Sequence, residues 1–435
     1  MTLRNNRALR FPGPAVIILA FALLAPTVAQ AAEVEEGTVI NAANLSSLMD
    51  KEFEGKTIGS MLTENIQWMI REQGLTMTLR HSEEVPVDPR WIEATKKYSG
   101  DVSYDPATRL VSGYKAGLCF PDISLDDPHA ADKIMWNAYY IGGWPRGDLA
   151  NYPLFAFLFI NGDKGLERVQ HWALIRSFLK GRLDGEPVIG DGSIDFKQLL
   201  FAHYPYDIRG IGTFAIRYGN GKYDDSWAYL RTVRRTRRLS GGTWHDPIGG
   251  TDQLNDEVEI NSAFPTWYTG FKLLEKRWIL AVAHSRWPVW DQDKKKPVEA
   301  FPLVDLENKP YWNPLDDWEP REVYVIDAAT PDTHPYSRKV MYLDTKTWVY
   351  YLGEFYDKKG EFWKVGIFNM RPIKTEDGGW GVISNQGHTI DFKRRHATIF
   401  AHGKQSQFNT PGVGPEDVSL EVLEAAGQGR WRVPE

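Results

Sequence analysis

The stretch RKVMYLDTKTWVYYLGEFYDKKGEFWKVG, residues 338–366, is the clearest indication of the fold class, because it joins three β-rich runs by two short turns. The first run ends in DTKT (residues 344–347), where Asp344 can accept hydrogen bonds from the backbone that follows it. The second run ends in DKKG (residues 357–360), which puts glycine where a hairpin loop needs a left-handed residue. The stretch therefore predicts a meander of antiparallel strands.

Both faces of this meander are apolar. A sheet with water on one side shows a cleaner alternation of apolar and polar residues, so each side must be covered by a helix, a second sheet or a bound apolar molecule. With a period of two, one face is predicted to carry Trp348, Tyr350, Leu352 and Tyr356, and the other Val349, Tyr351 and Phe355.

Three further segments, together with the meander, resemble the sequences of a known family. They are KYSGDVSYD (residues 97–105), AGLCFPDISLDDPHAADKIMWN (residues 116–137) and DSWAYLRTVRRTRRL (residues 225–239). With them, the chain resembles domain-of-unknown-function family 1329, also called outer-membrane lipoprotein-sorting-like, within the periplasmic lipoprotein-carrier superfamily. The resemblance implies a half-open barrel that holds acyl chains against a helical lid, and an accessory role beside membrane exporters.

The N-terminus has the pattern of a signal peptide. Arg4, Arg7 and Arg10 precede an apolar run over residues 14–28, and AQA (residues 29–31) follows it, with small residues at the positions that a signal peptidase reads. We expect cleavage after Ala31 and export to the periplasm. The net charge of −6 argues against nucleic acid as a partner, and loss of the three leader arginines would make it more negative.

Residues 32–435 are expected to form one domain, because no low-complexity linker divides them. Helical spacing predicts amphipathic helices over residues 55–73 and 164–183. The predicted fold class is α+β, mostly β, with one large, strongly curved antiparallel sheet, a half-open barrel, and helices against its concave face. Strands are predicted over residues 76–84, 214–218, 227–239, 269–283, 322–328, 338–368 and 389–400.

Metal and enzyme motifs fail on inspection. DGSIDF (residues 191–196) copies half of a calcium loop but lacks the other ligands, so a turn is the better interpretation. The histidines 388, 396 and 402 lack the spacing of a zinc site, and no GxSxG elbow or dinucleotide fingerprint occurs. Asp316, Asp317 and Glu319 beside tryptophan would suit a glycosidase, but that chemistry depends on geometry. We expect no metal, no cofactor and no catalytic residue.

The sequence favours a soluble periplasmic carrier that buries a hydrophobic or lipid-like molecule without chemistry, with an inner-membrane exporter and an outer-membrane protein as expected partners. A periplasmic enzyme acting on glycan or lipid, and an envelope adaptor without ligand, remain the alternatives. The arginines of residues 231–238 fit either a solvated strand or a clamp for an anionic lipid head or protein. The predicted ligand-binding residues are Met341, Trp348, Tyr350, Tyr351, Phe355, Trp363, Arg235 and Arg237.

Overall fold

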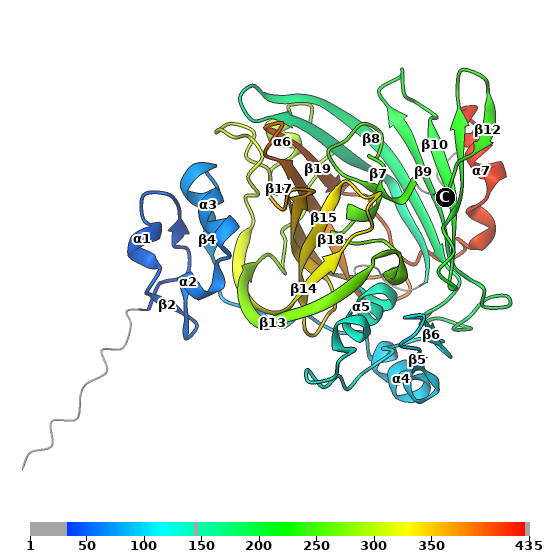
Figure 1. Cartoon of the computed structure of the whole chain (residues 1–435). Coiled ribbons are helices and arrows are strands. Elements are labelled where there is room, and N and C mark those ends of the chain that lie inside the picture. Colours follow the sequence, from blue (N-terminus) through cyan, green and yellow to red (C-terminus); the bar gives the residue numbers. More distant parts are fainter. Residues whose placement is uncertain (1–32, 143–146, 242, 431–435) are drawn as a thin grey trace, which may run out of the picture.

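A computed structural model describes residues 33–142, 147–241 and 243–430 (Figure 1). The predicted signal peptide, residues 1–31, lies outside the described residues. A sheet of 15 strands dominates the described chain, and it stays open because β1 and β12 end it on opposite sides. In spatial order the strands are β1 (Val39–Ile40), β4 (Met77–Leu79), β14 (Asp317–Ala329), β15 (Tyr336–Asp344), β16 (Tyr350–Asp357), β17 (Phe362–Lys374), β18 (Trp380–Asp391), β19 (His396–His402), β7 (Asp148–Asn161), β8 (Gly165–Phe178), β9 (Ile194–Tyr204), β10 (Gly212–Tyr218), β11 (Asp225–Leu230) and β12 (Arg235–Arg238), with β13 (Gly270–Ala281) paired to β14.

Every strand pair in this sheet is antiparallel except β4 with β14. The long strands curve around a hollow side (Figure 1). The prediction of a mostly β, half-open, curved sheet is therefore confirmed. Two small hairpins stand apart from it, β2 (Glu52–Phe53) with β3 (Lys56–Thr57), and β5 (Ser103–Tyr104) with β6 (Val111–Ser112).

Helices cover both sides of the sheet. The meander's outer face meets α2 and α3, the outer face of β9–β11 meets α7, and α5 lies on the hollow side (Figure 1). None of the helices that the structure describes has the length and hydropathy of a transmembrane helix. The helices are α1 (Leu45–Leu48), α2 (Ile58–Met61), α3 (Glu64–Glu72), α4 (Pro89–Tyr98), α5 (Ala130–Ile141), α6 (Pro297–Ala300) and α7 (Leu420–Gly427).

Both predicted turns of the meander are confirmed. The Oδ1 atom of Asp344 accepts hydrogen bonds of 2.8 Å from the backbone N–H groups of Lys346 and Thr347. Asp357 accepts in the same way from the next turn, and Gly360 has φ +81°, the left-handed conformation that glycine adopts at little cost. Local side-chain chemistry alone therefore sets the ends of β15, β16 and β17.

The predicted division of the meander into two faces is wrong after Tyr350. Leu343 pairs with Tyr350 and Tyr342 with Leu352, so Tyr351 is an extra residue that forms a β-bulge. The bulge shifts the alternation by one residue. Tyr350 and Phe355 consequently lie on the hollow side, whereas Tyr351 and Leu352 both face α2 and α3.

The predicted helix over residues 164–183 is also wrong, because this segment is strand β8. The residues of β8 that face the hollow side occur at every second position from Trp172 to Phe178. Apolar residues occur on both faces of this strand, so the sequence shows no clear alternation of apolar and polar residues, and its apolar positions also match helical spacing by chance. The predicted helix over residues 55–73 is divided into α2 and α3 by two extended residues. Thr63 caps α3 by accepting a 3.1 Å hydrogen bond from Ile66 N–H. The single strand predicted over residues 227–239 is instead the hairpin of β11 and β12.

Candidate functional site

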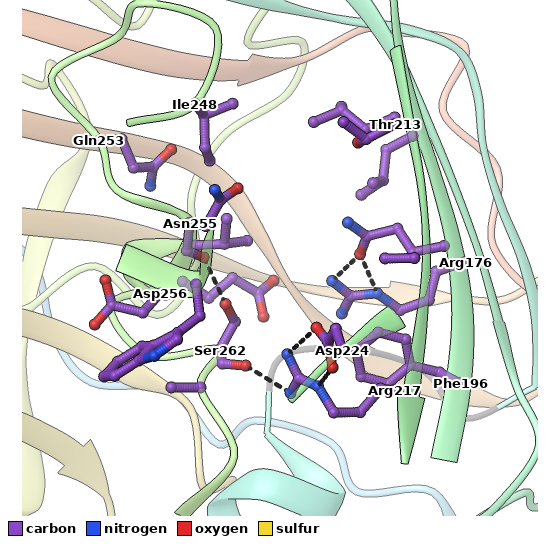
Figure 2. Close-up of a pocket in the computed structure, with 18 of the residues that line it drawn as sticks. Arg176, Phe196, Thr213, Arg217, Asp224, Ile248, Gln253, Asn255, Asp256 and Ser262 are labelled. Atoms are coloured by element: carbon purple, nitrogen blue, oxygen red, sulfur yellow. Dashed lines mark hydrogen bonds and ion pairs between the residues drawn. The ribbon is translucent and has the colours of Figure 1, made fainter. Parts of the chain in front are cut away.

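A cavity of about 460 Å³ lies on the hollow side of the sheet, against β7–β11 (Figure 2). Its other walls are α5, residues of β16–β19 such as Tyr350 and Phe400, and the segment of residues 243–267, which we call the strap. The strap contains three short 3₁₀ helices, Thr243–His245, Asn255–Glu257 and Pro265–Trp267. The volume is within the range of small-molecule sites, roughly 300–1,000 Å³.

The strand register arranges the sheet wall in rows. Leu174, Leu200, Thr213 and Ala228 face one another across β8–β11 and form an apolar row. Two residues further along each strand, about 6.6 Å away, Arg176, Gln198, Ala215 and Ser226 form a more polar row. Beyond the apolar row the wall is aromatic, with Phe155, Phe157, Trp172 and Phe400.

Two buried arginines mark the polar end of the cavity (Figure 2). Arg176 donates a 2.8 Å hydrogen bond through Nε to Gln198 Oε1, and its guanidinium lies 4.8 Å from the Phe196 ring. Arg217 donates to Asp224 Oδ2 at 2.9 Å and to the strap at the Ser262 carbonyl oxygen at 3.0 Å. These partners fix both guanidinium groups, so the polar end is preorganised rather than mobile.

Helix α5 supplies the floor beside this polar end. Tyr139 donates a 2.7 Å hydrogen bond to Asp195 Oδ2, and the Lys180 ammonium lies 3.0 Å from Asp195 Oδ1. Burial, together with the neighbouring Asp195 charge, raises the pKa of Tyr139 well above its ordinary value. The phenol therefore stays neutral and acts as a hydrogen-bond donor.

A buried ionic cluster pins the strap to the sheet. Lys339 of β15, fully buried, donates to Asp256 Oδ2 at 3.0 Å, to the Ile260 carbonyl oxygen at 2.7 Å and to the Tyr268 hydroxyl at 3.0 Å. Burial alone would raise the pKa of Asp256, but the charges of Lys339 and His334 hold it below its ordinary value. Asp256 is therefore ionised, and the Lys339 ammonium of β15 compensates its charge.

A second set of contacts fixes the strap nearer its start. Asp252 accepts hydrogen bonds from His396 and from Thr398 of β19, the latter at 2.9 Å, and forms an ion pair of 3.0 Å with Arg394. Lys364 of β17 donates to the Asp252 carbonyl oxygen at 2.7 Å. The cavity wall formed by the strap is thus held through charged groups on three different strands or turns of the sheet.

We expect the contact between His396 and Asp252 to make stability depend on pH. The hydrogen bond that His396 donates to Asp252 raises the pKa of His396 above its ordinary 6.5. The folded state then binds the proton more tightly than the unfolded state, so the stabilisation is complete below pH 6.5 and is lost as pH rises through the folded-state pKa. In urea titrations across this range, His396→Gln should remove that slope. If the variant keeps the same pH dependence of the free energy of unfolding, other titratable groups cause it.

Most of the predicted ligand-binding residues do not lie together at the cavity. Tyr350 lines the cavity and accepts a 3.3 Å hydrogen bond from Asn261 of the strap. Tyr351 bonds Asp344 on the opposite face, and the indole of Trp363 donates to Asp391 at 2.9 Å. The predicted residues that are not among the lining residues of the described chain are Met341, Trp348, Tyr351, Phe355, Trp363, Arg235 and Arg237.

The acids considered for glycosidase chemistry lie in other networks. Asp316 accepts hydrogen bonds from Ser285 at 2.6 Å and Asn369 at 2.9 Å, and fully buried Glu319 contacts His284 at 2.9 Å. Neither acid lines the cavity. Burial lowers the pKa of His388 to about 4 and that of His402 to about 3, so both imidazoles are neutral at pH 7. In the residues that the structure describes, no group of three or more metal-binding side chains occurs.

The sequence interpretation missed the main cavity wall, which is formed by β7–β11. The sequence did contain a strand signal here, because the spacing of two residues places Trp172, Leu174, Arg176 and Phe178 on one face of a strand. An arginine between apolar residues on the same face of a strand indicates a polar group aimed into an otherwise apolar interior. The strap offered no comparable pattern, since its position depends on contacts with residues far away in the chain.

Comparison with solved structures finds distant similarity. A domain from Vibrio parahaemolyticus named for outer membrane lipoprotein sorting is 18% identical, with a TM-score of 0.45, and the match covers 67% of this chain and 97% of that chain. A DUF1329 family protein from Desulfovibrio piger is 17% identical, with a TM-score of 0.43 and coverage of 63% and 92%. A LolA superfamily protein from Nitrosomonas europaea is 12% identical, with a TM-score of 0.40 and coverage of 67% and 98%.

No curated protein matches this chain. The family model described as Protein of unknown function (DUF1329) matches residues 39–418, which is most of the sequence. That range includes the meander and all three of the other segments on which the sequence resemblance was based. The chain therefore belongs to the DUF1329 family.

Proposed function

We propose that this protein is a soluble carrier that holds one hydrophobic or lipid-like molecule in the cavity and performs no chemistry on it. The observation that carries the proposal is the cavity of about 460 Å³ itself, with its aromatic and aliphatic walls. A sheet whose side chains only packed against one another would leave no such space, because protein interiors are close-packed. An adaptor without ligand accounts less well for this cavity.

The rows of the wall support an amphiphilic ligand. Apolar residues such as Leu174, Leu200 and Trp172 would contact its hydrocarbon part, and Arg176 and Arg217 would lie near its polar part. Each methylene moved from water into this wall contributes about 0.8 kcal/mol. Affinity would then grow with chain length while remaining non-covalent, which suits a molecule that is bound at one place and released at another.

The expected leader supports the periplasm as the site of action, and transfer between membranes or to an exporter is the transport step that such a carrier would serve. Two features favour carriage over catalysis. Three acids on the cavity wall, Asp195, Asp224 and Asp256, are each engaged with a cation. The strap is anchored beside the cavity by the buried ion pair of Asp256 with Lys339 and by the pair of buried Asp252 with exposed Arg394, which fits enclosure of a ligand.

A pair of adjacent substitutions tests the proposal. After solvent stripping, the wild type should bind an apolar fluorescent probe saturably. Tyr350→Glu should abolish that binding while leaving a cooperative thermal transition, because a carboxylate in an apolar cavity is poorly solvated. Tyr351→Glu, on the outer face, should mainly lower stability. If the wild type binds no probe, or if Tyr350→Glu binds it as the wild type does, the proposal is wrong.

A further inference from the structure

Two hairpin ends lie side by side at one end of the sheet. The turn of residues 205–211 joins β9 to β10, and the turn of residues 231–234 joins β11 to β12. Arg231 connects them, because it donates to the Tyr206 carbonyl oxygen at 2.5 Å and its guanidinium lies 4.6 Å from the Tyr206 ring. In Figure 1 the tips of this region point away from α4, β5 and β6.

These two hairpin ends gather exposed apolar side chains. Among the described residues, thirteen large hydrophobic side chains are exposed, and five of them lie here. Scattered single apolar residues are normal on a protein surface, whereas a cluster indicates an interaction site. The most exposed of all is Tyr206, at 74%. The five are Tyr204, Tyr206, Ile211, Leu230 and Val233.

The same hairpin ends are strongly basic. Residues 204–211 and 230–238 contain six arginines and one acid, Asp207, although the whole chain has a net charge of −6. Arg209, Arg234, Arg235 and Arg237 are exposed. We call these arginines, together with Arg231 and the five apolar residues, the rim.

The rim is continuous with the cavity. Ile211 and Leu230 line the cavity and are also exposed, at 39% and 36%. Arg235 lies directly opposite Leu230, and Arg237 directly opposite Ala228 of the cavity wall. Because directly paired residues share a face of the sheet, both arginines project on the cavity side. The predicted ligand-binding arginines thus lie beside the entrance rather than on the wall.

We propose that the rim docks on an anionic lipid bilayer, so that the cavity entrance faces the membrane surface. Tyrosine is enriched at membrane interfaces, because its ring is apolar and its hydroxyl is polar. Arginine side chains near an anionic leaflet are attracted by its negative surface potential. Protection of an edge strand from aggregation would explain the arginines of β12, but it would not explain exposed Tyr206 and Val233 beside them. Passage of a ligand from the bilayer into the cavity rests on the proposed carrier function, whereas docking does not.

Sedimentation with vesicles tests the docking at low salt. The full chain after leader removal should sediment with vesicles containing phosphatidylglycerol, but not with vesicles of phosphatidylcholine alone, and high salt should release it. Arg235→Glu with Arg237→Glu should weaken binding at least tenfold. Tyr206→Ser with Val233→Ser should also weaken it, although the charge is retained. The matched reversal Lys96→Glu with Lys97→Glu on α4 should bind like the wild type.

The outcomes separate docking from carriage. The rim variants should still bind the apolar probe, so loss of vesicle binding with retained probe binding supports docking. If the wild type ignores phosphatidylglycerol vesicles, or binds both kinds equally, the proposal is overturned. It is also overturned if rim variants that fold normally sediment like the wild type. It is overturned as well if the rim of the wild type binds an acidic protein but not the vesicles. Failure of the wild type to bind the probe would count against the carrier function alone.

Discussion

Lys339→Met should lower the free energy of unfolding by about 3–5 kcal/mol, the cost of leaving a buried charge without its partner. Lys339 and Asp256 are both almost completely buried, and the ammonium also holds the carbonyl oxygen of Ile260 in the strap. Within the part of the chain that the structure describes, its removal leaves the Asp256 carboxylate with hydrogen bonds to His334 and Tyr268. Urea titration of wild type and variant measures the difference.

Two controls distinguish this mechanism from general damage. Arg395→Ala removes an exposed ion pair with Asp163 and should cost less than about 1 kcal/mol. Adding Asp256→Asn to Lys339→Met removes the uncompensated charge and should restore part of the lost stability. If Lys339→Met costs no more than Arg395→Ala, the buried cluster does not hold the strap as described.

Ala215→Trp should abolish ligand binding while the protein stays folded. Ala215 lies on the cavity wall between Gln198 and Ser226, so an indole there would occupy the space a ligand needs. In a packed core the same change would be strongly destabilising, because overpacking forces side chains off their rotamers and shifts the backbone. In an open cavity the ring has room, and filling a cavity can even stabilise a protein. Loss of probe binding with little change in the melting temperature is therefore the expected combination.

The matched control places the same side chain where no cavity exists. Ala43 is exposed in the turn before α1, so Ala43→Trp should change neither probe binding nor the melting temperature. If Ala215→Trp unfolds the protein, the wall is a packed core. If it binds the probe as tightly as the wild type, the probe binds elsewhere on the molecule.

The sequence predicted the meander well because its information is local. Asp344 and Gly360 fix two turns through their own side-chain and backbone chemistry, and the short β-rich runs on either side of these turns have the length of strands. The bulge at Tyr351 could not be seen in the same way. It depends on how β16 pairs with β15, and a shift of one residue exchanges the two faces of the strand.

The cavity was harder to predict, because its parts are distant in the sequence. Its wall begins in β7 and β8, where apolar residues on both faces imitate a helix. The strap reaches this wall only through long-range contacts, such as those of Lys339 with Asp256 and of Lys364 with Asp252. Neither lysine stands out in the sequence, since an isolated lysine in a strand is normally exposed. Tyr350 alone among the predicted ligand residues was placed by the fold on the cavity wall.

Solvent extraction of protein purified from its native compartment without detergent tests the carrier account most directly. Mass spectrometry of the extract should find a lipophilic molecule in amounts close to one per wild-type chain. The Ala215→Trp variant, purified in parallel, should yield far less, and Ala43→Trp should match the wild type. An extract from the wild type that contains no such molecule, or equal amounts from wild type and Ala215→Trp, would contradict the account.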